Sequence, residues 1–163
     1  MKKTIVGGVG YQFMRDLSLG PVLTEELAKI EWPEHISIDA DFSYGPVAIV
    51  QRFECEPNLC DRIVLFSAVE RGHPPGKITA YRWQGELPEE EEIQARVGEA
   101  VTGVVNLDNL LIVGEQFEIW PNEVFVVEVE PADLGWGDGF SPVIDEVIDE
   151  VVRTIKRVAL EGV

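Results

Sequence analysis

The sequence is poor in histidine and cysteine, the residues on which many metal sites and nucleophilic sites depend. Only two histidines and two cysteines occur among 163 residues. No HExxH motif, G-x-S-x-G motif or Ser/His/Asp order is present. Cys55 and Cys60 have no second Cys/His pair that would complete a zinc site, and two cysteines exclude a disulfide scaffold. We interpret them as reduced thiols and leave their role open.

Basic residues are scarce as well. Lysine and arginine total 13 against 30 aspartates and glutamates, which gives a formal net charge of −17. Such a surface repels phosphate backbones, so we expect no nucleic-acid partner; a basic peptide or a basic protein face would be attracted instead. The charge by itself is more simply explained by solubility.

Long hydrophobic runs are absent. No stretch approaches the ~18 consecutive apolar residues of a membrane span, so we expect no membrane partner. The MKKTIVGGVG start is followed by Tyr11 and Gln12, whereas a signal peptide would continue with a longer apolar core. A cytoplasmic protein is the simplest interpretation. At this length one domain over residues 1–163 can bury roughly 70% of the unfolded chain's surface.

Short apolar segments alternate with segments of helical spacing. Strands are predicted at residues 4–9, 36–40, 63–69 and 124–129, with a half-exposed edge strand at 77–83. Helices are predicted at residues 17–31, 46–53, 89–107 and from 142 onward. This alternation predicts an α/β fold, a single three-layer domain with a mostly parallel five-stranded sheet and helices on both faces.

The last helix has the clearest start signal. Ser141 is a favourable N-cap, Pro142 suits the first helical position, and Asp145 and Glu146 complement the positive end of the helix dipole. We therefore expect the Ser141 side chain to cap this helix.

The carboxyl ends of the predicted parallel strands form the expected ligand edge. Residues 8–10, 39–41 and 67–71 all fall at such ends. The glycines are not a dinucleotide fingerprint, because Phe13 stands where the third glycine of G-x-G-x-x-G belongs. Carboxylates near this edge either share a cation or remain solvated, and the sequence leaves both open.

Three segments carry a further pattern. Residues 6–20 (VGGVGYQFMRDLSLG) are similar to a G-x-G-N-x-x-x-x-D-[DE]-x-x-G start, and residues 67–76 (SAVERGHPPG) to a D-A-V-x-x-G-x-x-P-G stretch. Residues 127–131 (VEVEP) and 136–142 (WGDGFSP) are similar to a G-I-E-P … G-x-G-L-S-P ending. In this order, across nearly the whole chain, they resemble the hydrogenase maturation proteases. The resemblance implies that family's fold and a nickel-sensing endopeptidase that trims the C-terminal extension of the [NiFe]-hydrogenase large subunit.

The chain departs from this pattern at the positions where the family has its metal ligands. The resemblance places the family's first acid at Leu17, with Asp16 beside it, and its strand-end aspartate at Ser67. The histidine that opens a late helix falls near Gly103. Leucine and glycine offer no donor atom and a neutral hydroxyl is a weak one, whereas nickel needs several imidazole or carboxylate donors. The resemblance therefore implies a protease scaffold without its nickel ligands.

The resemblance also implies a changed binding cleft. The family asparagine of the first loop corresponds to Tyr11, and a D-G-G-T-x-G loop is similar to the segment ADFSYG, with its acid shifted to Asp39 or Asp41. We expect Tyr11, Phe42 and Tyr44 to line the cleft as aromatic anchors beside these two acids.

Our leading hypothesis is a non-proteolytic protein that binds a hydrogenase large subunit or a related protein and needs no cofactor. The alternative is an active, metal-dependent endopeptidase with nickel or another ion on relocated ligands, for which Asp16, Asp41, Glu70 and His73 are the candidates. A third interpretation, an unrelated small-molecule-binding domain, is permitted by the fold class alone.

Overall fold

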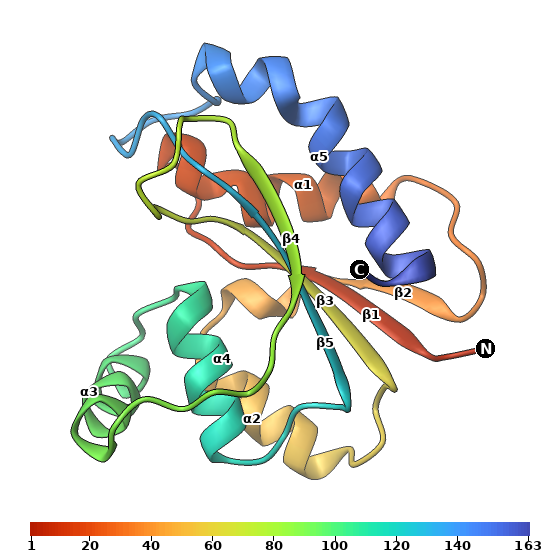
Figure 1. The fold of residues 1–163 in the computed structure, drawn as a ribbon, viewed down its shortest axis with the longest axis vertical. Helices are drawn as coiled ribbons and strands as arrows, with labels where there is room; N and C mark the ends of the chain where they lie inside the picture. Colours follow the sequence, from red (N-terminus) through yellow and green to blue (C-terminus); the bar gives the residue numbers. More distant parts are fainter.

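A five-stranded sheet divides the molecule into two helical layers (Figure 1). The computed structural model describes residues 1–163. The strands are β1 (Thr4–Gly8), β2 (Ile36–Asp39), β3 (Arg62–Ala68), β4 (Ile78–Arg82) and β5 (Glu123–Val129). Their order is β2-β1-β3-β5-β4, and only β4 runs antiparallel. The predicted mostly parallel five-stranded sheet is confirmed, including the edge position of β4.

Helices cover both faces of the sheet, as the alternating pattern predicted. Helices α1 (Leu19–Ala28) and α5 (Pro142–Glu161) lie on one side. Helices α2 (Pro46–Cys55), α3 (Glu90–Val101) and α4 (Leu107–Gln116) lie on the other (Figure 1). The short 3-10 helices η1 (Arg15–Ser18) and η2 (Asp41–Ser43) follow β1 and β2. No helix is both long enough and apolar enough to cross a membrane.

The central strands are apolar on both sides because each side packs against helices. In β3, Val64 and Phe66 join the core beneath α1 and α5, while Ile63 and Leu65 join the core beneath α2 and α4. All four side chains are fully buried. The two cores fix the register of the sheet, since a slip of one residue would exchange its faces.

The segment predicted as one helix over residues 89–107 is two helices, and this prediction was wrong. Gly103 adopts a φ of +88°, which ends α3, and Asn106 starts α4 by accepting a hydrogen bond from the backbone N–H of Asn109 at 2.8 Å. Asparagine is a favourable N-cap, so the signal for a second helix was present in the sequence. The apolar spacing continues across the break, which is why it predicted a single element.

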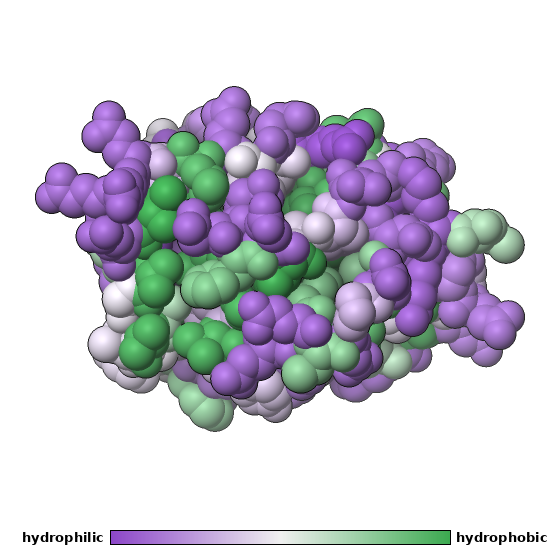
Figure 2. All heavy atoms as spheres, turned by 90° about the horizontal axis from the view of Figure 1, so that it is seen from below, coloured by the Kyte–Doolittle hydropathy of each residue, from purple (hydrophilic) through white to green (hydrophobic).

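The outer face of the α2–α4 layer carries apolar side chains among charged ones (Figure 2). Val47 of α2, Val101 of α3 and Phe117, directly after α4, are exposed. This surface lies on the far side of α2 and α4 from the sheet. None of these three residues lines the pocket at the carboxyl ends of β1 and β3.

Candidate functional site

A pocket of about 230 Å³ opens at the carboxyl ends of β1 and β3. Leu17 from η1 and Ser67 from the end of β3 line it together. Its far wall comes from α3 and the start of α4, through Arg96, Asn106 and Asp108. The structure therefore brings together two of the three positions at which the resemblance expects metal ligands.

Leu17 offers this pocket no atom that could bind a metal, and Ser67 offers only a neutral hydroxyl, which is a weak ligand. The Ser67 side chain is 4% exposed, and its hydroxyl donates a hydrogen bond to the backbone carbonyl of Val9 at 2.7 Å. This bond links the ends of β1 and β3, so the hydroxyl has a structural partner. Leu17 packs against the core beneath α1 and α5. Val69 and Val105 add apolar surface to the pocket, and the charged side chains of Glu70, Arg96 and Asp108 complete its lining.

Gly103 lies outside this pocket. It is exposed, and a Cβ atom built on it would meet nothing within 4 Å. Asn106, three residues later, lines the pocket instead. The sequence comparison placed the third ligand position near Gly103. In the structure, Asn106 and not Gly103 shares the pocket with Leu17 and Ser67.

Tyr11 stands between this pocket and a second one of about 390 Å³. Its hydroxyl accepts a hydrogen bond from the backbone N–H of Val105 at 2.8 Å, which spans from the β1 loop to the loop before α4. Tyr44, which is 74% exposed, lines the second pocket together with Ala40 and Ser43. Tyr11 and Tyr44 thus line the adjoining pockets; that these pockets form a binding cleft stays a prediction.

The other three predicted cleft residues do not line either pocket. Phe42 is 1% exposed and belongs to the core, where it packs on Gly7 so closely that a Cβ on Gly7 would lie 2.2 Å from the Phe42 ring. The expectation of an anchor at Phe42 was wrong, because its side chain fills the space that a glycine leaves beside β1. Asp39 and Asp41 both pair with Arg52 of α2 instead of facing the cleft.

Asp16 is fully buried and holds together two distant parts of the chain. Its carboxylate accepts backbone hydrogen bonds from Ala132, Asp133 and Ser141, each at 2.8 Å, and a fourth from the Ser141 hydroxyl at 2.7 Å. Burial alone would raise the pKa of Asp16, but these hydrogen bonds outweigh it and lower the pKa below its ordinary value. Four donors occupy the carboxylate, so Asp16 has a structural role at this edge.

Arg71 forms a network that the sequence did not reveal. Its guanidinium donates two hydrogen bonds to Asp108, at 2.9 and 2.8 Å, and two to Glu128 of β5, at 3.1 and 2.7 Å. Tyr81 of β4 donates to the same Glu128, which is 6% exposed. The bonds to Glu128 and Asp108 raise the pKa of Arg71. Burial and then the Glu128 bond raise the pKa of Tyr81. The network fixes α4, and with it one wall of the first pocket, against the sheet.

The four candidate ligands for a relocated metal do not form a cluster. Asp16 is enclosed by hydrogen-bond donors, and Asp41 pairs with Arg52. Glu70 is exposed and lines the first pocket, whereas His73 is exposed on the loop after β3 and does not line it. Nowhere do three or more histidine, cysteine, aspartate or glutamate side chains lie close enough to hold a metal ion.

Solved structures of other proteins share this architecture over nearly the whole chain. The hydrogenase maturating endopeptidase HybD from E. coli is 16% identical with a TM-score of 0.70, over 99% of this chain and 94% of that one. The hydrogenase 2 maturation peptidase from a Thaumarchaeota archaeon is 17% identical with a TM-score of 0.64, over 98% of each chain. The chain has the fold of the hydrogenase maturation proteases. This confirms the fold that the three sequence segments implied.

A third structure with this fold is the [NiFe] hydrogenase maturation protease HycI from Thermococcus kodakarensis, which is 17% identical with a TM-score of 0.57, over 99% of this chain and 93% of that one. No family model matches the sequence, and no curated protein matches it. The nickel that the resemblance implies does not fit the residues present, because Leu17 and Gly103 have no side-chain atom that could bind it, Ser67 has only a neutral hydroxyl, and three or more potential ligands do not cluster anywhere.

Proposed function

We propose that this protein binds the large subunit of a [NiFe] hydrogenase, or a related protein, in the cleft at the carboxyl ends of its strands, and leaves it uncut. The observation that carries the proposal is that Leu17 and Ser67, which lie side by side in the first pocket, offer only one neutral hydroxyl between them, and that three or more potential metal ligands do not cluster anywhere in the protein. The fold shared with hydrogenase maturation proteases supports the choice of partner.

The two adjoining pockets suit an extended segment of a protein. Tyr11 and Tyr44 offer rigid aromatic surface of the kind that anchors protein interfaces. The first pocket is small, and apolar side chains share its lining with Glu70, Arg96 and Asp108, so it suits a single side chain of the partner. The net charge of −17 favours a partner segment with basic residues on either side.

Native mass spectrometry of the protein mixed with a large-subunit precursor tests this proposal. A complex that contains the full precursor mass is expected, and a chelator should leave both the complex and the precursor mass unchanged. A precursor shortened at its C-terminus would overturn the proposal. If a chelator stopped that shortening, the relocated-ligand endopeptidase would be the better description.

Two matched variants locate the binding surface. Tyr44→Ala removes an exposed ring and should weaken the complex about tenfold or more, because aromatic anchors dominate interface energies. Leu160→Ala removes an exposed apolar side chain of α5, away from the cleft, and should leave the affinity unchanged. Equal affinity in the two variants would exclude the second pocket as the binding surface.

A further inference from the structure

A groove of about 440 Å³ lies between α3 and the end of α4. Gln116 and Phe117 form its α4 wall. The α3 wall is one face of the helix, because its residues are spaced at i, i+3, i+4 and i+7: Glu90, Ile93, Gln94 and Val97. None of these six residues lines the two pockets of the cleft, so an inference drawn from the groove does not depend on the proposed function.

The surface inside the groove is largely apolar. Ile93 and Val97 are half-buried, and the side chain of Phe117 is 47% exposed. The backbone N–H of Phe117 donates to the carbonyl of Val113 at 3.1 Å, so the ring is presented to solvent from a backbone that is held in place. Val101, one turn beyond Val97 on α3, is also exposed and extends the apolar surface. An exposed apolar patch with a polar rim is typical of a protein interaction site.

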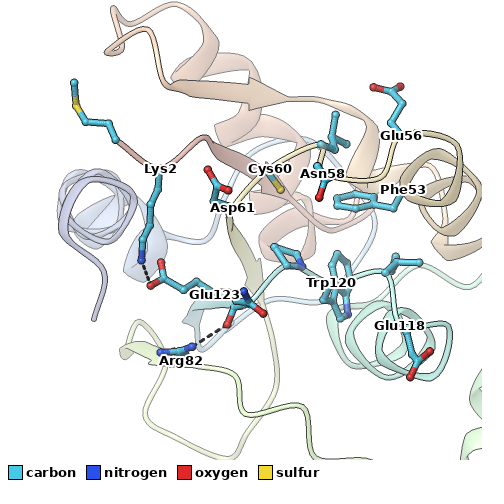
Figure 3. A pocket seen from close by; sticks show the side chains of 15 residues that line it. Lys2, Phe53, Glu56, Asn58, Cys60, Asp61, Arg82, Glu118, Trp120 and Glu123 are labelled. Atoms are coloured by element: carbon cyan, nitrogen blue, oxygen red, sulfur yellow. Dashed lines mark hydrogen bonds and ion pairs between the residues drawn. The ribbon is translucent and has the colours of Figure 1, made fainter.

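The rim of the groove is acidic. Residues 89–92, at the start of α3, are four exposed glutamates, and only Glu92 among them forms an ion pair, with Arg96 at 3.4 Å. At the other wall, the last turn of α4 contains no basic residue to balance the negative end of its helix dipole. Figure 3 shows the carboxylate of Glu118, which follows this turn, pointing away from Trp120. No lysine or arginine lines the groove.

This charge selects among the occupants that an apolar groove could take. A second copy of the chain would bring the same net charge of −17, and an anionic membrane surface would be repelled in the same way. An amphipathic helix of another protein fits such a groove by laying its apolar side chains into it. Lysine or arginine residues at the edges of that helix would be attracted by the glutamates of the rim.

We propose that this groove binds a basic amphipathic helix of a protein partner. Its apolar side chains pack against Ile93, Val97 and Phe117, and its basic side chains lie beside the glutamates of residues 89–92. The exposed charges of the rim make the association weaken as the salt concentration rises.

Fluorescence anisotropy of a labelled, capped helical peptide tests the proposal. The probe has leucine at helical spacing on one face and lysine on the other, and the control peptide has glutamate in place of every lysine. Saturable binding of the lysine peptide is expected, and the glutamate peptide should bind at least tenfold more weakly. Phe117→Ala should weaken binding of the lysine peptide about tenfold, whereas Leu160→Ala, at an exposed apolar position of α5, should leave it unchanged.

Two triple variants that remove the same charge separate the rim from the overall charge of the protein. Glu89→Gln/Glu90→Gln/Glu91→Gln should weaken binding of the lysine peptide about tenfold. Glu146→Gln/Asp149→Asn/Glu150→Gln, at exposed positions of α5, should change it less than twofold.

Four outcomes would overturn the proposal. Absence of saturable binding would exclude the site, and equal binding of the two peptides or equal weakening in the two triple variants would reduce the effect to overall charge. Unchanged affinity in Phe117→Ala would exclude the groove as the binding surface. Sedimentation of the protein alone provides the fourth test, because a dimer that Phe117→Ala abolished would assign the groove to a second copy of the chain.

Discussion

Ser141 donates two hydrogen bonds to Asp16, one from its backbone N–H to Oδ1 at 2.8 Å and one from its hydroxyl to Oδ2 at 2.7 Å. The expectation that the Ser141 hydroxyl caps α5 was wrong, because this hydroxyl turns to Asp16. The backbone of Ser141 still starts the helix, since its carbonyl accepts from Ile144 and Asp145. The pair joins the first loop to the start of the last helix.

Asp16→Asn should lower the free energy of unfolding by about 3 kcal/mol, because it places an amide donor among four donors in a buried site. Urea denaturation at pH 7 measures this loss. Asp133→Asn is the control: Asp133 is exposed and its side chain accepts only from Gly135, so a change below about 1 kcal/mol is expected. Equal losses in the two variants would contradict the structural role of Asp16.

The same pair predicts a pH dependence. The pKa of Asp16 is lowered in the folded protein, so its contribution is fully present above the unfolded-state pKa of about 3.9. It is lost as the pH falls through the lower, folded-state value. The stability gap between the native protein and Asp16→Asn should therefore be constant above about pH 5 and shrink below about pH 4. A gap that did not narrow in acid would contradict the lowered pKa.

Gly8→Ala should destabilise the protein by about 3 kcal/mol, since a Cβ at this position would lie 2.2 Å from the backbone carbonyl oxygen of Gly20. Neither β1 nor α1 can move away without disturbing the core. Gly98→Ala is the matched control, because Gly98 lies in α3 with open space around it. Alanine there should stabilise by up to about 1 kcal/mol. Thermal and urea denaturation of both variants measure the contrast.

The two cysteines should differ in reactivity. Burial raises the pKa of the Cys60 thiol to about 11, so it carries almost no thiolate at pH 7, whereas Cys55 is exposed. Brief treatment of the native protein with iodoacetamide should add one label, and denaturation should allow two. The Cys55→Ser variant should remain unlabelled when native. Fast native labelling of Cys60 would contradict its burial.

Restoring donors in the first pocket should restore a response to nickel. The triple variant Leu17→Glu/Ser67→Asp/Asn106→His places three ligands around one space. Without metal it should be less stable than the native protein, because a carboxylate replaces a buried hydroxyl. Nickel at a hundredfold excess over its dissociation constant should raise the free energy of unfolding of the triple variant by about 2.7 kcal/mol. This gain is measured as a rise in melting temperature. The native protein should show no such rise.

The fold was largely predictable because its signals are local and repeat. Apolar runs such as residues 63–69 and the proline at the first position of α5 mark elements whatever surrounds them. The break between α3 and α4 was missed because the apolar spacing passes through Gly103 without interruption. Weighing the Asn106 cap against that spacing would have found it.

The site was less predictable because it depends on which side chains meet. Phe42 and Tyr44 are both aromatic and two residues apart, yet one fills the core beside Gly7 and the other is exposed. Asp108 and Glu128, the partners of Arg71, lie 37 and 57 residues away in the sequence, so no local sequence pattern predicts these ion pairs. Such pairings follow from the folded arrangement of the strands rather than from spacing.

Helix α3 contributes Arg96 to the first pocket but has only one buried residue, Ala100. It packs on α2 and α4 rather than on the sheet. Little apolar area therefore holds it, and we expect its amides to exchange with deuterium through local opening while those of β3 and β5 exchange only on global unfolding. The wall of the pocket formed by α3 can therefore open locally while the sheet stays folded. A partner that contacts Arg96 should slow hydrogen–deuterium exchange throughout α3.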